Sequence, residues 1–560
     1  MQTTSEIGNR IDSSVSETED SKPALSLQFR LCEVLLIFVV FALYVSFQTP
    51  DSNEAHYLTK AKHYWNPQWC PTDHFLNSAD AHAVFYWTIG WLTLYFPLPV
   101  VAWIGRIICW ALLAISWQRL SYTLIKQKWM SVCTAILWLL GMHYGHMAGE
   151  WVVGGVEAKC FSYALIFWAI GDALQHRWNR AWILLGIASA FHVLVGGWAV
   201  ITLFIAWLLV ERSKSGFVKM LPGLVAGGLI SLIGLVPGAM LSAGQPDNVV
   251  ASANHIYVFQ RLSHHLVFNS FDQNFQIRFG LLSAVWLIIA GWIFFRREER
   301  KTNLVNAFVL GTLLLTVIGV LIDQVLLYQL AQHQLAAKLL RFYWFRLSDM
   351  AIPLGMAFSL PWGLMLIAEK RGWKVLNLGR YLLGASAISI VLLIGSHFID
   401  SSFNLGLGRT TDHPDWKPVC LWIKENTPAD AIFLTPRYQK SFKWNAERGE
   451  VFSTKDIPQD ARSITEWSDR WNAVNRALYY ISVPYKDRVP FVYTADPLQL
   501  KHDQLKYALD QVIDKYDCQY LVIDHRITAN AWMKPGSTYQ KVYPTAQSGN
   551  DTYEVYQIHE

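Results

Sequence analysis

About eleven stretches of this chain are apolar enough to cross a lipid bilayer, and they constrain its fold more than any other feature. The hydrocarbon core is about 30 Å thick, so a spanning helix needs about 20 mostly apolar residues. Composition agrees, because only 16% of the residues are charged, against about 25% in soluble domains. The sequence therefore predicts an α-helical polytopic membrane protein with about 11 transmembrane helices. They are expected at residues 28–48, 98–118, 129–147, 152–174, 180–194, 196–211, 220–241, 279–295, 303–322, 349–368 and 380–398.

Two of these stretches, 180–194 and 196–211, are shorter than the others and meet at Gly196-Gly197. Irregular backbone at membrane depth is tolerated only where it is covered by protein or lines a cavity. The pair therefore fits either a broken helix pair or a re-entrant hairpin.

Basic residues in the short loops predict the orientation of the chain. Lysine and arginine concentrate on the cytoplasmic side of membrane proteins. We therefore expect a cytoplasmic N-terminus, an extracytoplasmic C-terminal domain and a location in the plasma (inner) membrane. The residues that carry this prediction lie in alternate loops, on the side of the N-terminal tail: Arg119, Lys126, Lys128, Arg177, Arg180, Arg212, Lys214, Lys219, Arg296, Arg297, Arg300, Lys301, Lys370, Arg371, Lys374 and Arg380.

Changes in composition divide the chain into three regions. Residues 1–27 are polar and are expected to form a disordered cytoplasmic tail. Residues 28–400 form the multi-spanning membrane domain, with a large first outer loop at 49–97. Within that loop, the apolar stretch 84–96 stops at Pro97 and is expected to be a single helix in the membrane interface.

Hydrophobicity falls after about residue 410, and residues 410–560 are expected to form an extracytoplasmic α/β domain. Amphipathic periodicity predicts helices at 415–425, 464–480 and 504–515. Short apolar runs predict strands at 431–435, 520–524 and 553–558. A formal net charge of +5 for the whole chain is too small to indicate nucleic-acid binding.

Two carboxylates, Asp51 and Glu54, follow the first apolar stretch at the point where it meets water. Ionised acids are costly inside a bilayer but tolerated at its surface. Their spacing is that of a capping box, in which the two residues stabilise a helix start. The tract is therefore either a helix start, a reaction centre facing a lipid-borne substrate, or both.

Several short motifs add to this architecture. Asn53, Glu54 and Tyr57 match a pattern "DE-x-x-Y" after a first span, with Asn53 in place of the first acid. The segment 82–87 is similar to a surface-helix motif, and the segment from Arg341 to Arg346 is similar to an "R-Y-L-x-P" motif that opens a late span. With the long outer loop and the outward C-terminal domain, these features resemble the C-type membrane glycosyltransferases (GT-C). The similarity is greatest to the branch of protein O-mannosyltransferases and aminoarabinose transferases.

The resemblance implies transfer of a sugar from a lipid-linked donor, a polyprenyl-phosphate carrier, to an unknown glycan, lipid or protein acceptor at the outer face. A carboxylate would activate the acceptor and positive charge would stabilise the departing phosphate. Membrane lipids are further expected partners, and a divalent cation, Mg or Mn, is a possible cofactor. Glu54 and Asp51 are the candidate catalytic residues, Lys159, Arg341, Arg346, His192 and His56 the candidate substrate-binding residues, and Glu150 the candidate metal ligand.

Simpler roles compete with these assignments. Arg341 and Arg346 also fit headgroup anchors, Lys159 fits a snorkelling lysine, and His192 fits a hydrogen-bonded core histidine. Asp349 has the spacing to pair with Arg346 at i, i+3. At the level of function, a transporter or lipid flippase and a non-catalytic binding protein of the same fold remain open.

Overall fold

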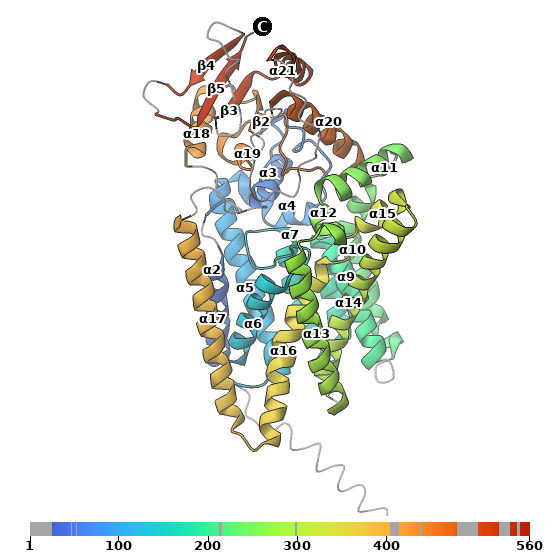
Figure 1. Ribbon diagram of the computed structural model, residues 1–560. Coiled ribbons are helices and arrows are strands. Elements are labelled where there is room, and N and C mark those ends of the chain that lie inside the picture. Colours follow the sequence, from blue (N-terminus) through green and yellow to red (C-terminus); the bar gives the residue numbers. More distant parts are fainter. Residues whose placement is uncertain are drawn as a thin grey trace, which may run out of the picture.

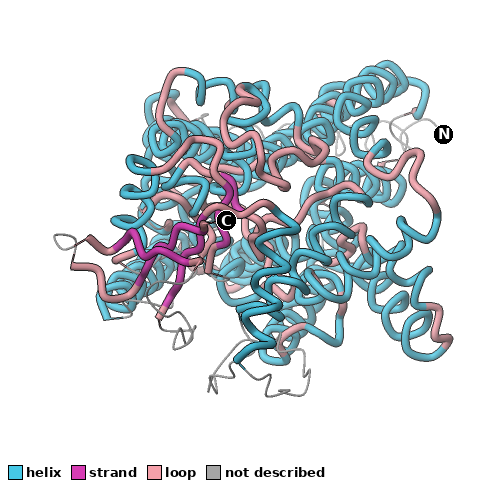
Figure 2. Tube along the Cα trace, turned by 90° about the horizontal axis from the view of Figure 1, so that it is seen from above, coloured by secondary structure: helices cyan, strands magenta, loops and turns pink. Residues whose placement is uncertain are grey.

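The computed structural model describes residues 25–45, 48–51, 53–211, 216–296, 299–403, 414–436, 439–478, 502–525, 538–545 and 549–559. The polar tail expected at 1–27 lies outside the described residues except for its last three. Figure 1 shows a bundle of long helices with a small sheet and further helices at one end. From above, the strands lie over the helices (Figure 2).

Each predicted span coincides with a helix. These are α2 (Leu27–Tyr44), α5 (Leu98–Leu124), α6 (Met130–Gly145), α7 (Ala158–Ala173), α8 (Trp178–Phe191), α9 (Val193–Val210), α10 (Phe217–Met240), α13 (Gln273–Arg296), α14 (Arg300–Leu321), α16 (Arg346–Lys370) and α17 (Val375–Phe403). Within the described residues, eight helices are long and apolar enough to cross a membrane. The count of eleven is not confirmed, because α6, α7 and α8 have 16, 16 and 14 residues. At 1.5 Å per residue they extend only about 21–24 Å.

The short stretches around Gly196 form two helices joined by one residue, His192. Gly196 of α9 lies against the backbone of Ser189 in α8, where a Cβ atom would have no room. This contact folds α9 back onto α8 as a tight hairpin. On its other side, α8 packs on α10 through the facing pair Gly186 and Gly227.

The first outer loop contains α3 (Glu54–Trp65), α4 (Ala83–Thr88) and a 3-10 turn, η1 (Gly90–Leu94). The expectation of one continuous helix over 84–96 was wrong. Gly90 lies against Ala61 of α3, with only 2.7 Å from a Cβ built at Gly90 to the Cβ of Ala61. Glycine also weakens a helix interior, so the chain breaks where it packs closest to α3.

The C-terminal domain has a five-stranded sheet in the order β2-β1-β3-β5-β4. β1 (Ile432–Leu434) pairs in parallel with β2 (Gly449–Glu450) and β3 (Tyr520–Asp524), and β5 (Tyr553–Ile558) pairs antiparallel with β3 and β4 (Tyr539–Tyr543). Four helices accompany the sheet: α18 (Trp416–Asn426), α19 (Phe442–Ala446), α20 (Ala461–Leu478) and α21 (His502–Tyr516). The predicted helices and strands of this domain are confirmed, and β2, β4 and α19 are additional.

The C-terminal domain shares a hydrophobic core with later segments of the membrane domain. Helix α20 packs on α11 (Asp247–His255). Their core also takes in the π-helical turns η2 (Ile256–Arg261) and η4 (Ile322–Gln329), and α15 (His333–Leu340). Trp444 of α19 packs in the core of the first outer loop. The domain is therefore fixed onto the membrane domain along a broad surface.

The basic loops gather at the opposite end of the bundle. Arg119 of α5 pairs with Asp172 of α7. Arg300 of α14 donates to the carbonyls of Ala173 and Leu174 at 2.8 and 2.7 Å and pairs with Glu211 after α9. Figure 1 shows α16 and α17 joined at this same end. The two ends of the bundle therefore differ in character, with basic loops at one and the sheet domain at the other.

Candidate functional site

Glu54, the first residue of α3, lies in a fully buried clamp. Arg106 of α5 donates from Nε and Nη2 to its two carboxylate oxygens, both at 2.6 Å. The backbone N–H groups of Val156 and Asp51 also donate to it, at 2.9 and 2.7 Å. Neither Glu54 nor Arg106 has any exposed surface. The carboxylate therefore fixes the first loop to α5 and to the loop before α7.

Asp51 reinforces the same junction. Its Oδ2 accepts from the N–H of Gly155 at 2.8 Å. A Cβ at Gly155 would lie 2.7 Å from Asp51 Cβ, so only glycine fits this approach. Half of the predicted capping box is present, because Glu54 bonds back to Asp51 N, whereas the Asp51 side chain reaches across to Gly155. These contacts favour the helix-start interpretation of the tract, and a catalytic role for either acid stays a prediction.

A second cluster surrounds Glu150, in the loop before α7. Lys159 Nζ lies 3.3 Å from Glu150 Oε1, and Arg346 Nε lies 3.0 Å from Oε2. Tyr163 donates its hydroxyl to the same carboxylate at 3.2 Å. The Arg346 guanidinium also covers the ring of Tyr343 at 3.9 Å. The structure thus brings together two of the predicted phosphate ligands, Lys159 and Arg346, because both contact the carboxylate of Glu150.

Two histidines extend this cluster toward the first loop. Arg346 Nη1 lies 3.3 Å from His192 Nε2, and the Nδ1 of His192 lies 3.3 Å from the N–H of Val195, at the start of α9. The His192 ring is 5.6 Å from that of His82, whose Nε2 lies 3.4 Å from the hydroxyl of Tyr57. His192 is therefore both a helix cap and a neighbour of Arg346.

Asn53 bridges the other side of the cluster. Its amide donates to Glu157 Oε1 at 2.6 Å, and its carbonyl oxygen accepts from Lys455 of the C-terminal domain. Glu157 in turn lies 3.8 Å from Lys159. An aspartate at 53 could not donate to Glu157, which explains why an amide serves here. Burial lowers the pKa of Lys455 to about 7.

His56 closes the arrangement, because its Nδ1 lies 3.0 Å from Asp456, the residue after Lys455. Together with two pairs of chain neighbours, His56–Tyr57 and Lys455–Asp456, these contacts form a closed circuit, which we call the polar ring. Its members are His56, Tyr57, His82, His192, Arg346, Glu150, Lys159, Glu157, Asn53, Lys455 and Asp456. The polar ring joins the first loop, the membrane domain and the C-terminal domain.

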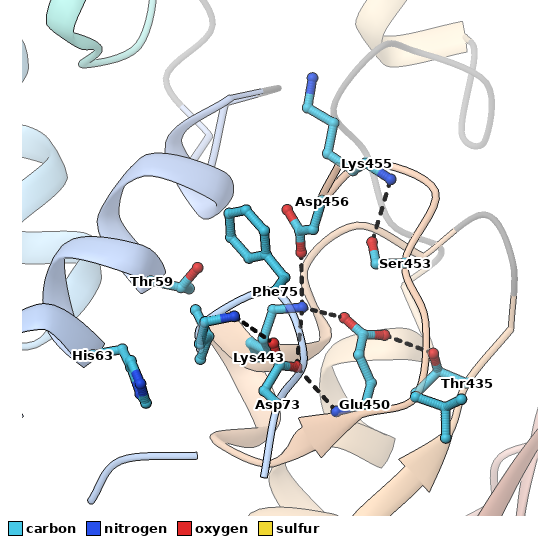
Figure 3. Close-up of polar contacts among 12 residues, drawn as sticks. Thr59, His63, Asp73, Phe75, Thr435, Lys443, Glu450, Ser453, Lys455 and Asp456 are labelled. Atoms are coloured by element: carbon cyan, nitrogen blue, oxygen red, sulfur yellow. Dashed lines mark hydrogen bonds and ion pairs between the residues drawn. The ribbon is translucent and has the colours of Figure 1, made fainter. Parts of the chain in front are cut away.

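Asp456 is held by a further buried ion cluster. Lys443 of α19 lies 2.7 Å from Asp456, 2.7 Å from Glu450 and 3.4 Å from Asp73. Figure 3 shows Lys443 between these three carboxylates, with Glu450 also bonded to Thr435. Burial raises the pKa of Glu450 to about 7, although Lys443 acts in the opposite direction.

Two expectations about the late helices need correction. Arg341 lies outside the polar ring, donating to Asn254 and to the carbonyl of Gln459, both at 2.7 Å. It therefore ties α11 to the C-terminal domain. Asp349 does not pair with Arg346. It accepts from the backbone N–H groups of residues 147, 148 and 150, at 2.7, 2.9 and 3.2 Å, and so fixes the loop that carries Glu150.

The surroundings of Glu150 do not fit a divalent cation. Its two oxygens face the cationic groups of Lys159 and Arg346, which occupy the directions a metal would need. Among the residues that the structure describes, no three His, Cys, Asp or Glu side chains converge as a ligand set. Residues 150, 159 and 346 instead form an ion cluster of one carboxylate and two cations.

A largely apolar cavity of about 380 Å³ lies between α5, α7 and α8, with Arg180 as its charged lining residue. Phe161 and Phe191 line it, with ring centroids 5.1 Å apart. Phe191 directly precedes His192, and Phe161 is two residues after Lys159. Lys159 and His192 themselves are not among the residues that line the cavity.

Comparison with known proteins leaves the family open. Residues 414–474 match a family described as a domain of unknown function, DUF6798. Among curated proteins, none matches the sequence.

Two solved structures show a weak overall likeness. One is the Archaeoglobus fulgidus oligosaccharyltransferase in complex with Zn and sulfate, with a TM-score of 0.43, 10% identity and coverage of 89% of this chain and 68% of that chain. The other is the archaeal oligosaccharyltransferase AglB from Archaeoglobus fulgidus in complex with an inhibitory peptide and a dolichol-phosphate, with a TM-score of 0.42, 12% identity and coverage of 89% and 69%. At these scores the likeness identifies neither the family nor the activity of this chain.

Proposed function

We propose that this protein is a GT-C-like membrane glycosyltransferase that transfers a sugar from a polyprenyl-phosphate carrier to an acceptor outside the membrane. The observation that carries the proposal is the pair of cations, Arg346 and Lys159, on Glu150. The helices α5, α7 and α8 of the same membrane domain also line a largely apolar cavity of about 380 Å³. A polyprenyl phosphate has an apolar tail and an anionic head, and it needs both environments.

The cationic side supports this substrate class. Arginine matches phosphate oxygens through its planar set of donors. Arg346 uses Nε on Glu150 and Nη1 on His192, while its Nη2 makes no hydrogen bond within the described part of the chain. A phosphate oxygen would take this donor and share Lys159 with Glu150. As the sugar leaves, the same cations would stabilise the negative charge on the carrier phosphate.

The difference between the two ends of the helix bundle supports a reaction outside the cytoplasm. Basic loops mark the cytoplasmic side, and here they lie opposite the sheet domain. The polar ring would then face the outer surface of the plasma (inner) membrane, covered by the C-terminal domain. An acceptor glycan, lipid or protein would reach it from that side.

The test is a transfer assay with the full chain in nanodiscs. Radiolabelled polyprenyl-phosphate sugars, including mannose and aminoarabinose donors, are supplied with membrane extracts as acceptor. We expect labelled product to form together with released polyprenyl phosphate, and unlabelled polyprenyl phosphate to inhibit. If the chain neither binds polyprenyl phosphate nor consumes any of the donors, the proposal fails.

A further inference from the structure

We propose that His56 is the general base of this transfer, and that Asp456 of the C-terminal domain positions it. The inference rests on the proposed function and specifies which group removes the proton from the acceptor hydroxyl. It assigns this step to a histidine–aspartate pair assembled from two regions 400 residues apart in sequence.

The geometry fixes the orientation of the His56 ring. Nδ1 lies 3.0 Å from Asp456 Oδ1, and the ring packs on Phe75 with centroids 4.4 Å apart. A carboxylate can only accept at this distance, so Nδ1 carries the hydrogen and Nε2 presents its lone pair. Within the described residues, no hydrogen bond engages Nε2. The side chain keeps 16% of its surface exposed, so Nε2 is open to an incoming hydroxyl.

Asp456 is itself held rigidly. Its Oδ2 lies 2.7 Å from Lys443 (Figure 3). This leaves Oδ1 for His56. Burial alone would favour the neutral acid, but Lys443 and the hydrogen bond from His56 hold the pKa of Asp456 well below its usual range. The carboxylate therefore stays ionised and can stabilise the imidazolium that forms during the reaction.

The charges facing His56 favour a neutral imidazole before the reaction. Burial lowers the pKa of His56, Asp456 opposes this shift, and Lys455 and Lys443 add to it. The pKa of the partly buried His82 is lowered to about 3 by desolvation and by the nearby His56 and Arg346. A neutral imidazole is the form that accepts a proton at neutral pH.

The step balances with the groups present. His56 Nε2 takes the acceptor O–H proton while the acceptor oxygen forms a bond to the anomeric carbon of the sugar. The bond from that carbon to the carrier phosphate oxygen breaks, and its electron pair leaves with the phosphate toward Arg346. The imidazolium then returns its proton to water. Glu54 is less suited to this role, since both its oxygens are held by Arg106 and backbone N–H groups.

The experiment compares two variants with two matched controls, in transfer and in binding of undecaprenyl phosphate. His56→Gln should reduce transfer by roughly 10²- to 10⁴-fold and leave undecaprenyl phosphate affinity within about twofold of wild type. Asp456→Asn should reduce transfer and shift the acid limb of the pH–rate profile to lower pH, because it removes the charge that stabilises the imidazolium.

Each control variant removes a polar contact of similar kind that does not involve the Nε2 atom of His56. His74→Gln replaces another first-loop histidine, which lies 3.1 Å from the carbonyl of Ser463 in the C-terminal domain. Glu447→Gln removes a carboxylate of the same domain from Lys424, which lies 2.8 Å from it and outside the Lys443 cluster. Both should keep transfer within about threefold of wild type. A loss in both controls equal to that in His56→Gln would mean that domain contact, and not a base, is being measured, and would overturn the assignment.

A measurement on the unmodified sequence covers the case in which His56→Gln does not fold. Diethyl pyrocarbonate should carbethoxylate His56 and abolish transfer. Hydroxylamine should remove the carbethoxy group and restore transfer. Full activity with His56 carbethoxylated, or normal transfer by His56→Gln, would overturn the histidine base while leaving the glycosyltransferase proposal in place. A wild type that binds no undecaprenyl phosphate and transfers no sugar would overturn both.

Discussion

Arg106 of α5 and Glu54 of α3 form a paired contact of two 2.6 Å hydrogen bonds with no exposed surface on either residue. Removing one partner of a buried ion pair leaves an uncompensated charge and costs about 3–5 kcal/mol. Glu54→Gln should therefore lower the thermal unfolding midpoint of the detergent-purified protein. Glu54→Gln combined with Arg106→Met should recover part of this loss. A Glu54→Gln variant with unchanged stability and no transfer would instead identify Glu54 as a catalytic group.

The two arginines of the predicted late motif should respond differently to conservative replacement. Lysine keeps the charge but loses the planar donors. Arg346→Lys should weaken undecaprenyl phosphate binding by roughly tenfold, equivalent to about 1.4 kcal/mol. Arg341→Lys should not, because Arg341 contacts Asn254 and Gln459 outside the polar ring. Equal affinities for both variants and wild type, measured by scintillation proximity, would leave Arg346 as a structural residue.

The sequence predicted the helices well because each has a local apolar or amphipathic pattern that does not depend on distant contacts. All eleven apolar stretches became helices, and the amphipathic patterns of the C-terminal domain marked α18, α20 and α21. The number of spans does not follow from apolar pattern alone, because α6, α7 and α8 are apolar but have only 16, 16 and 14 residues. β2, with two residues, and β4, with Gln540 and Lys541 in its centre, carry too little apolar pattern to be recognised.

The polar ring could be predicted only in part. Lys159, Arg346, His192, His56 and Glu150 stood out as polar residues at the ends of apolar stretches. Asn53 was noticed only as a departure from a family pattern, whereas its hydrogen bonds to Glu157 and Lys455 give it a bridging role. Lys455 and Asp456 had no local signal, since they are ordinary charged residues of a loop whose position depends on how the C-terminal domain docks.

The apolar cavity provides a test that depends on the length of the lipid. Ile187 of α8 lines it, and tryptophan at this position would fill much of the space. Ile187→Trp should weaken binding of undecaprenyl phosphate by roughly tenfold, given a loss of about two buried CH₂ groups at about 0.8 kcal/mol each. Binding of the short geranyl phosphate should be nearly unchanged. Equal loss for both lipids would indicate a distorted head-group site, and no loss would place the tail elsewhere.

The Glu450 carboxyl should leave a signature in the pH dependence of stability. Burial raises its pKa from 4.5 to about 7, so between these values the folded state holds a proton that the unfolded state has released. The contribution of this proton to the free energy of unfolding is fully present below pH 4.5 and is lost as the pH rises to 7. Its slope is at most about 1.4 kcal/mol per pH unit. The difference in unfolding midpoint between wild type and Glu450→Gln should therefore shrink from pH 5 to 7 and level off above it. A constant difference, measured by differential scanning fluorimetry, would show that Glu450 is ionised throughout.

Orientation in the membrane can be tested with two exposed lysines at opposite ends of the bundle. Lys417 lies on α18 of the C-terminal domain, and Lys374 lies in the basic loop between α16 and α17. In a background with the exposed Cys32 replaced by serine, a membrane-impermeant maleimide should label Lys417→Cys in intact cells. It should label Lys374→Cys only after permeabilisation, because positive residues are retained on the cytoplasmic side. The reverse pattern would place the polar ring in the cytoplasm, where an extracytoplasmic acceptor could not reach it, and the direction of the proposed transfer would have to be inverted.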